Sequence, residues 1–395
     1  MPAQVAPSAE AVPHSRIREL AEQAMRMQQA GETIYKLYFG ESNLPTPEFI
    51  KRAAEKALRD GKTCYTSNAG IPALRESLAR YYDKHHGVTL DPFSEVVVTS
   101  SGVQALSVAI RCTLDPGDEA IMLTPAWPNG SAIVQMSNAV VRQYAQPLMG
   151  DRYGIDFDAL ESMITSRTRL LLYTSPSNPL GWVATESDQD RLLELARRHN
   201  LWLMADEVYE RLYYPEGKPL GTPVPSILRK ATRKDALIVV QSFSKSYCMT
   251  GWRLGWIVAR KDLAAKVTQL NEFMVSCPAH FTQSAGQAAL DWGERSIADF
   301  LASLKANRDF CMAKLAAIPG VTLPRPDGAF YLFPKIANLT DSFEFCRRAL
   351  QETGVGLAPG VAFGAGGEGN IRLCYAADRS VLEPALDRLA QFISA

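Results

Sequence analysis

The chain has 395 residues, of which 47% are hydrophobic and 21% are charged, so it is long enough to bury a substantial core and does not have the composition of a disordered protein. Its 42 Lys and Arg residues balance its 42 Asp and Glu residues, which leaves no bulk positive charge to hold nucleic acid or an anionic membrane. Because no apolar run is long enough to cross a bilayer, we expect a soluble protein. Together with the balanced charge, this predicts that the protein binds neither membrane nor nucleic acid.

The N-terminal segment MPAQVAPSAEAVPHSR contains three prolines and no apolar stretch of signal-peptide length. We therefore expect a flexible arm there and, by default, cytoplasmic localisation. Seven cysteines lie between Cys64 and Cys374 without a CxxC pair, and the five histidines lack metal-ligand spacing. This pattern predicts neither a disulfide framework nor a metal site, and we expect the cysteines to be small buried side chains.

Short apolar runs alternate with longer segments of helical period through the middle of the chain. The predicted strands are Glu95–Thr99, Glu119–Leu123, Leu170–Thr174, Leu201–Ala205, Leu237–Gln241 and Leu254–Ala259. Helices are predicted between them, among others at Val103–Cys112, Glu186–Asn200 and Leu263–Phe273. The alternation is typical of an α/β domain with a mainly parallel sheet covered by helices.

After about Trp292 the pattern changes. A long amphipathic helix through Ala317 precedes the Pro- and Gly-rich passage PGVTLPRPDGAFYLFP, and two further helices follow, one from Ser342 and one at the C-terminus. This pattern predicts a smaller α+β domain. We assign residues 45–293 to the large domain, and residues 1–44 and 294–395 to the small one.

Five polar clusters each follow a predicted strand. In chain order they are TSSG, TPAWPN, SPSNP, DEVY and SFSK. Since ligands of open α/β sheets bind beyond the carboxyl ends of the strands, five clusters at one edge predict one composite site.

Three of the clusters carry recognisable chemistry. The free N–H groups of Gly102 and Val103 could bind a phosphate at the start of a helix, although the same pattern also serves ordinary helix capping. Lys245 follows two serines and stands eight residues before Arg253. Burial and the like charge of the arginine would disfavour its ammonium form and so activate it for imine formation. A lone lysine at the end of a strand would more often reach solvent. Asp206 ends a strand, where a carboxylate is commonly only a helix cap. Neither a P-loop nor GxGxxG is present, which disfavours nucleoside triphosphates and dinucleotides as ligands.

Taken together, these residues resemble the class I and II aminotransferases of fold type I, which use pyridoxal 5′-phosphate (PLP). The resemblance runs from about Ser15 to the C-terminal helix, through SRIREL, GKTCYTSNAGIPALRESLA, TPAWPN, SNPLG, DEVY, SFSKSYCMTGWRLGW and GNIRLCYA. It implies a large α/β domain with a mainly parallel, seven-stranded sheet, and a smaller α+β domain built from both termini.

The resemblance also implies a role for each site residue. Lys245 would form an imine with PLP, Asp206 would pair with the pyridine nitrogen, and Tyr209 would hydrogen-bond the ring oxygen together with Asn178. Trp127 would lie on the ring face, and the phosphate would be held by Ser101, Gly102, Val103, Ser242, Ser244 and Arg253. The substrate would contact Gly40, Trp127 and Asn178, with its α-carboxylate on Arg372. Tyr65 would reach the phosphate of the neighbouring subunit, which implies a homodimer with shared active sites.

The residue types suit this chemistry. An ionised Asp206 would keep the pyridine nitrogen protonated, so that the ring can act as an electron sink. Lys245, once displaced by the amine of the substrate, could act as general base and acid at the substrate Cα. Arg372, on the predicted strand in NIRLCY, could bind a carboxylate through two parallel hydrogen bonds.

Two departures bear on the substrate. Aspartate-selective relatives bring a cation to the side-chain carboxylate, and the counterparts here are Asn271 and Val103, both uncharged. Tyr35, Tyr38 and Phe39 lie in the segment expected at the mouth of the site. The sequence thus predicts amino-group transfer between a neutral, apolar or aromatic amino acid and a 2-oxo acid. The usual NPTG is NPLG here, which leaves Asn178 intact.

Other functions stay open. The same lysine and aspartate serve β-lyases, cyclases and oxygen-using deaminases of this fold. A catalytically silent, PLP-binding regulatory protein is a further alternative, but the complete set of site residues argues against it.

Overall fold

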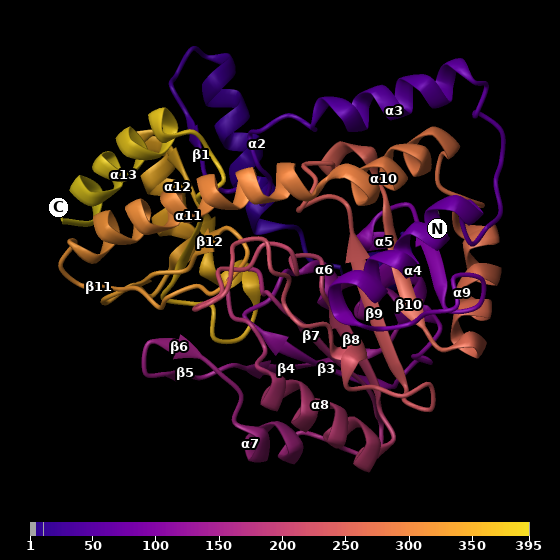
Figure 1. The fold of residues 1–395 in the computed structure, drawn as a ribbon. Coiled ribbons are helices and arrows are strands. Elements are labelled where there is room, and N and C mark those ends of the chain that lie inside the picture. Colours follow the sequence, from indigo (N-terminus) through magenta and orange to yellow (C-terminus); the bar gives the residue numbers. More distant parts are fainter. Residues whose placement is uncertain (1–4, 11, 395) are drawn as a thin grey trace.

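A computed structural model of the chain describes residues 5–10 and 12–394, and its centre is a seven-stranded sheet (Figure 1). Its strands are ordered β2-β10-β9-β8-β7-β3-β4. The bounds are β2 (Val96–Thr99), β3 (Glu119–Thr124), β4 (Val140–Ala145), β7 (Thr168–Thr174), β8 (Trp202–Asp206), β9 (Leu237–Ser242) and β10 (Gly255–Ala259). Six of these strands were predicted, and the predicted ends are correct to within two residues.

The sheet is mixed but mostly parallel. Only β10 runs antiparallel to its two neighbours, β2 and β9. The residues of β2, β3, β9 and β10 are all buried, as expected for strands covered on both faces. The edge strand β4 was missed from the sequence because only Tyr144 is buried in it, so VVRQYA lacks the apolar run of an inner strand.

Alternate side chains of the strands build two hydrophobic cores, one on each face of the sheet. Met204 and Ile238 belong to the core that packs under helices α5, α6 and α9, whereas Leu203 and Val239 belong to the larger core on the opposite face. The covering helices in this part of the chain are α3 (Glu48–Arg59), α4 (Pro72–His86), α5 (Gly102–Arg111), α6 (Asn129–Met136), α7 (Phe157–Ser162), α8 (Glu186–His199), α9 (Lys261–Met274) and α10 (His280–Trp292). The two cores confirm the predicted helix-covered α/β architecture.

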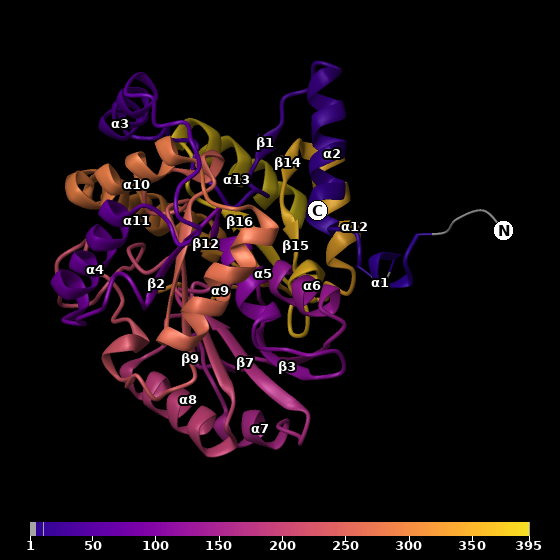
Figure 2. The same ribbon diagram turned by 90° about the vertical axis from the view of Figure 1, so that its right-hand side faces the viewer.

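The N-terminal segment packs against the C-terminal part of the chain (Figures 1 and 2). Strand β1 (Tyr35–Lys36) pairs in parallel with β14 (Val355–Gly356), and the amide of Cys374 donates to the carbonyl of Leu37 at 2.9 Å. The other elements here are α1 (Pro7–Glu10), α2 (Arg16–Gln29), α11 (Glu294–Ala316), β11 (Val321–Thr322), β12 (Tyr331–Leu332), β13 (Lys335–Ile336), α12 (Ser342–Thr353), β15 (Ala358–Pro359), β16 (Ile371–Cys374) and α13 (Arg379–Ser394). The domain boundaries at 44/45 and 293/294 stay a prediction.

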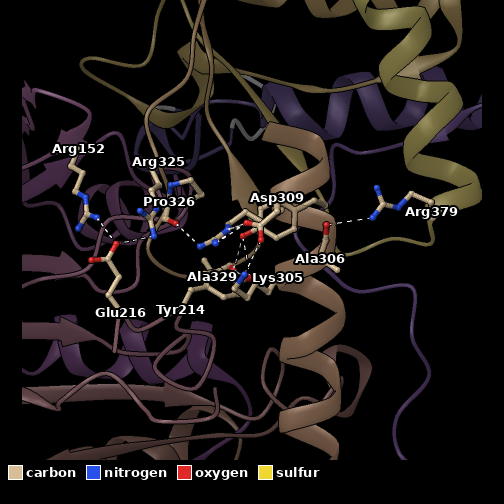
Figure 3. Close-up of polar contacts among 12 residues, drawn as sticks. Arg152, Tyr214, Glu216, Lys305, Ala306, Asp309, Arg325, Pro326, Ala329 and Arg379 are labelled. Atoms are coloured by element: carbon tan, nitrogen blue, oxygen red, sulfur yellow. Dashed lines mark hydrogen bonds and ion pairs between the residues drawn. The ribbon is translucent and has the colours of Figure 1, made fainter. Parts of the chain in front are cut away.

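Charged contacts tie the segment before β12 to the hairpin of β5 (Leu148–Met149) and β6 (Arg152–Tyr153), as Figure 3 shows. The carboxylate of Glu216 lies 3.4 Å from the guanidinium of Arg152 and 2.9 Å from that of Arg325. The amide of Ala329 donates to the carbonyl of Leu212 at 2.7 Å. These contacts hold the chain after β8 against the segment that enters β12, and both segments contribute to the site described below.

Three sequence expectations have specific outcomes. Across the described residues we find no helix apolar and long enough to span a membrane and no cluster of potential metal ligands. The cysteines are all free, but only Cys311, Cys346 and Cys374 are buried, and Cys64 is exposed, so the expectation of seven buried cysteines was wrong. Of the predicted N-terminal arm, residues 1–4 and 11 lie outside the described residues, and residues 7–10 form α1.

Candidate active site

A cleft of about 720 Å³ lies at the carboxyl ends of the central strands. All five predicted polar clusters contribute to its wall, and the segment 38–41 together with Tyr331 and Arg372 completes it. The clusters converge because the parallel strands that precede them all end at the same edge of the sheet. The composite site expected from the sequence is therefore present as one cavity.

Lys245 lies three residues beyond the end of β9 and projects into this cleft. Its Nζ donates to the carbonyl oxygen of Gly40 at 2.6 Å. Burial lowers the pKa of the Lys245 ammonium to about 8, and the nearby charges of Arg372 and Arg253 act in the same direction. The neutral amine, which is the nucleophilic form, is thus far more accessible near neutral pH than in an exposed lysine.

Asp206 is the last residue of β8 and is almost fully buried. Its carboxylate accepts one hydrogen bond from the described residues, from the amide of Val208 at 3.3 Å. Burial raises the pKa of Asp206 to about 7, and the hydrogen bond and the charge of Lys245 only partly oppose this effect. A buried carboxylate with so little stabilisation is suited to receive a cationic ligand atom.

Tyr209 follows Asp206 by three residues, and its hydroxyl lies 2.8 Å from the hydroxyl of Tyr331. Burial raises the pKa of the Tyr209 phenol, so it is a neutral hydrogen-bond donor at physiological pH. Tyr331, on β12, was not singled out from the sequence, where it lies in the Pro- and Gly-rich passage PGVTLPRPDGAFYLFP. A Cβ atom on Gly40 would overlap the Tyr331 hydroxyl, which explains the need for glycine at position 40.

An anion cradle lies at the start of α5. The Ser101 side chain caps the helix by accepting from the amide of Gln104 at 3.2 Å, and Gly102 is its first residue. The hydroxyls of Ser242 and Ser244 lie 2.9 Å apart. Together with Arg253 these serines line the cleft next to Gly102 and Val103, where the amides of a helix N-terminus favour an anion.

The close packing of β10 against the start of α5 depends on a glycine in β10. A Cβ atom on Gly255 would lie 2.6 Å from the carbonyl oxygen of Gln241 and 2.7 Å from the amide nitrogen of Gly102, and both are backbone atoms that cannot rotate away. Gly255 therefore allows β10 to lie directly against the start of α5.

Arg372 lies on β16, as predicted, and is buried. Its guanidinium donates to Oδ1 of Asn178 at 3.0 Å and to the carbonyl of Tyr38. It also lies over the ring of Tyr331, 4.7 Å from the ring centre. Its Nε is buried without a hydrogen-bond partner among the described residues, so an acceptor such as a carboxylate would complete its coordination.

Most of the other residues predicted to contact the cofactor or substrate line the cleft. Trp127 and Val103 line the cleft, and so do Tyr38 and Phe39, but Tyr35 does not.

The expectation for Asn271 was wrong. This side chain is fully buried and does not line the cleft, and its Oδ1 accepts from the side-chain Nε2 of Gln104 at 2.6 Å. Of the two predicted counterparts, only Val103 lines the cleft.

Tyr65 lies outside the cleft and is 88% exposed. It follows α3, whose buried residues are Ile50, Ala54 and Ala57, so the tyrosine is not required for local packing. Its predicted contact with a neighbouring subunit stays a prediction.

The residues present fit PLP. Lys245 offers an amine with a lowered pKa, and Asp206 offers a buried carboxylate that forms no salt bridge with the described residues. Ser242, Ser244 and Arg253 offer a cradle for a phosphate. The free Nε of Arg372 leaves a donor for a substrate carboxylate in the same cleft.

Comparison with known proteins identifies the family of the chain. The model of the family "Aminotransferase class I and II" matches residues 33–389. An aspartate aminotransferase of Geobacillus stearothermophilus is 33% identical over 382 residues, covering 95% of both chains. An aromatic-amino-acid aminotransferase of Thermococcus litoralis is 32% identical over 97% of both. The solved structure of the Thermus thermophilus aspartate aminotransferase with maleate superposes with a TM-score of 0.91 at 31% identity, covering 99% of this chain and 100% of that one.

Proposed function

The chain belongs to the class I and II aminotransferase family, whose members depend on PLP, and from that premise we propose that it transfers an amino group between a neutral amino acid and a 2-oxo acid. The observation that carries the proposal is the convergence of Lys245, Asp206, Arg372 and the Ser242–Ser244 cradle in one cleft. The related proteins are named for aspartate and for aromatic amino acids, so membership of the family leaves the substrate open.

In this proposal the phosphate of the cofactor would be held by Ser101, Gly102, Val103, Ser242, Ser244 and Arg253. Trp127, which lines the cleft, would pack against the ring, and Asn178 and Tyr209 would donate to the ring oxygen. The bound cofactor supplies an electron-accepting ring for the electron pair released when the Cα proton leaves. Asp206 would be ionised beside a protonated ring nitrogen, since that positive charge would offset the burial that otherwise raises the pKa of the carboxyl group.

Arg372 orients the substrate. Its unpartnered Nε and one adjacent N–H can hold the α-carboxylate through two hydrogen bonds, while Asn178 keeps the guanidinium in place. This directs the Cα–H bond toward Lys245. The Lys245 amine would remove the Cα proton as a general base and later donate a proton as a general acid. Its lowered pKa favours this exchange near neutral pH.

The substrate side chain is proposed to be neutral, and apolar or aromatic. Val103 lines the cleft with an aliphatic side chain, and Tyr38 and Phe39 line it with aromatic ones. A second carboxylate placed against Val103 would have no counter-charge and would be disfavoured by its desolvation.

We further propose a homodimer that shares its active sites. A second cavity, of about 750 Å³, shares Thr250 and Arg253 with the active-site cleft, and its wall includes Leu44 and Phe281. Exposed apolar side chains, among them Tyr65, Phe273, Met274 and Val275, would be covered by a second subunit. The PLP-dependent cytoplasmic enzyme expected from the sequence would then be a dimer with two composite sites.

The test is a screen of both half-reactions with the purified holoenzyme. Each amino acid is added alone, and the loss of the visible absorption of the lysine-bound cofactor is followed; each 2-oxo acid is then tested for its recovery. We expect leucine, methionine or phenylalanine to react with a higher specificity constant than aspartate, and Lys245→Ala to show no such absorption. Faster reaction with aspartate than with all three would overturn the substrate assignment.

A further inference from the structure

Gln104 and Asn271 form a side-chain hydrogen bond behind the anion cradle, and no proposed step uses either of them. Nε2 of Gln104 donates to Oδ1 of Asn271 at 2.6 Å. Asn271 lies in the last turn of α9 and is fully buried, whereas Gln104 lies in the first turn of α5 and is half-buried. Neither side chain lines the cleft. Any effect of this pair on the site must therefore act through the residues to which it is bound.

The side chain of Gln104 folds back over the turn that precedes α5. Its Oε1 accepts from the amide of Ser100 at 3.1 Å, while the backbone amide of Gln104 donates to the Ser101 hydroxyl at 3.2 Å. This reciprocal arrangement is similar to a capping box, in which two side chains at a helix start each satisfy a backbone amide of the other segment. The turn is thereby held from both sides.

The turn needs this support because the backbone of Ser101 is strained. Its φ is +126°, in a region that favours glycine. A non-glycine residue keeps such a conformation only where the surrounding contacts hold it. The conformation of Ser101 sets the direction in which the next two amides, those of Gly102 and Val103, point. If the turn relaxed, these proposed phosphate donors would be redirected.

Asn271 joins Gln104 to the central sheet. Its Nδ2 donates to the carbonyl of Val98 on β2 at 3.4 Å and to the carbonyl of Asn68 at 3.2 Å. The amide of Val98 donates in turn to the carbonyl of Ala69 at 2.9 Å. With its Nδ2 held by two carbonyl groups, the Asn271 side chain presents Oδ1 to Gln104. The contacts thus run without interruption from β2 to the turn at the start of α5.

Only an amide can occupy either position of this pair. Gln104 accepts from Ser100 and donates to Asn271, and Asn271 accepts from Gln104 and donates to two backbone carbonyls. A carboxylate could not donate and an ammonium could not accept, so either would leave a buried polar group unpaired. The amides also place no charge behind a cradle that is proposed to bind an anion.

We propose that Gln104 and Asn271 are positioning residues for the phosphate of the cofactor. The inference rests on the proposed function and deepens it. The hydrogen bond between the two side chains holds Ser101 in its strained conformation, so that the amides of Gly102 and Val103 are aimed into the cleft before an anion arrives. A cradle that is already ordered binds its anion more tightly, because less conformational freedom is lost on binding.

A comparison of PLP with pyridoxal tests the proposal, because the two molecules differ only in the phosphate group. The cofactor-free protein is titrated with each, and the visible absorption of the lysine-bound form gives both dissociation constants. We expect the wild type to prefer PLP. Gln104→Met and Asn271→Leu, which keep the approximate size and remove the hydrogen bond, should each reduce this preference about tenfold. Their affinity for pyridoxal should change little, whereas a general loss of structure would weaken both ligands alike.

The double variant and a matched control complete the experiment. Gln104→Met combined with Asn271→Leu should reduce the preference for PLP no further than the more damaging single variant, because both remove the same contact. Gln189→Leu is the control. Gln189 is a buried amide of α8 whose Nε2 donates to the carbonyl of Pro225 at 2.7 Å. Its substitution should lower the melting temperature and leave the preference unchanged.

Three results would overturn the inference: an unchanged preference in Gln104→Met, additive losses in the double variant, or an equal loss in Gln189→Leu. If Asn271→Leu does not fold, the half-buried Gln104 decides alone, through Gln104→Met against Gln189→Leu. A wild type that binds PLP no more tightly than pyridoxal would contradict the phosphate cradle itself, and with it both the proposed cofactor site and this inference.

Discussion

At the scale of single residues, burial shifts the pKa values of Lys245 and Asp206 in opposite directions. Burial destabilises the charged form of any side chain, so it lowers the pKa of Lys245 to about 8 and raises that of Asp206 to about 7. The lysine gains nucleophilic character, and the aspartate gains affinity for a cation. Under the proposed function, both effects would help the enzyme to bind its cofactor through an amine and to hold the ring nitrogen of the cofactor protonated.

The lowered pKa of Lys245 predicts the pH at which its amine reacts in the cofactor-free protein. Only the neutral amine attacks formaldehyde, so methylation of Lys245 in the presence of a mild reductant should rise with pH through a midpoint near 8, rather than near the ordinary value of 10.5. Mass spectrometry of the Lys245 peptide across pH 6–11 measures this midpoint, with Lys245→Arg as the blank. A midpoint above 10 would contradict the lowered pKa of Lys245.

The raised pKa of Asp206 predicts a conflict between stability and activity. Its folded-state pKa of about 7 exceeds the reference value of 3.8, so the cofactor-free protein loses stability as pH rises through that window. Asp206→Asn should therefore raise its melting temperature by a few degrees at pH 8 and leave it nearly unchanged at pH 4. The same variant should lower turnover of the holoenzyme by about a hundredfold or more, since the ring nitrogen loses its counter-charge.

Asp299→Asn, on an exposed face of α11, is the control and should change neither the melting temperature nor the turnover. Near wild-type turnover by Asp206→Asn would end the assignment of Asp206 to the ring nitrogen.

At the scale of secondary-structure elements, the site depends on how closely β10 packs against the start of α5. Gly255→Ala would force a Cβ atom against backbone atoms of β9 and of the Ser101–Gly102 turn. We expect weaker cofactor binding by at least tenfold and a lower melting temperature, because the cradle must open to admit the methyl group. Gly251→Ala, in the same sequence motif, places its Cβ atom in open space and serves as the control. Equal effects of the two substitutions would show that close packing at Gly255 is not required.

The inner strands and the polar clusters after them could be predicted because each is a local pattern. A strand buried on both faces is an apolar run, and the residue that ends it is polar where a site follows. The edge strand β4 could not be recognised, since its exposed side chains give no such contrast.

Residues whose role depends on distant contacts were mistaken or missed. Asn271 looked like a substrate-facing position, but its amide is engaged by Gln104, which lies 167 positions earlier in the sequence. Tyr331 was missed for the same reason, since its partner Tyr209 comes from another part of the chain.

At the scale of the whole molecule, the central question is whether one chain is sufficient for activity. Tyr65 is 88% exposed and lies outside the cleft of its own chain, and its family counterpart suggested a role across a subunit interface. We expect sedimentation to give a dimer. Lys245→Ala and an inactive Tyr65→Ala variant, mixed under conditions of subunit exchange, should then regain activity, because each heterodimer contains one intact site.

Tyr65→Phe separates the hydroxyl from the ring and should retain the dimer while weakening cofactor binding. A fully active monomer would contradict the shared-site proposal, as would the absence of complementation after proven exchange of subunits.

The most direct test of the whole account follows the amino group itself. The holoenzyme is given a ¹⁵N-labelled neutral amino acid and an unlabelled 2-oxo acid, and mass spectrometry identifies which product contains the label. We expect ¹⁵N in the amino acid formed from the 2-oxo acid, with none released as ammonia and no transfer by Lys245→Ala. Release of the label as ammonia would identify a lyase or deaminase instead, and would contradict the proposal that this cleft transfers amino groups between two carbon skeletons.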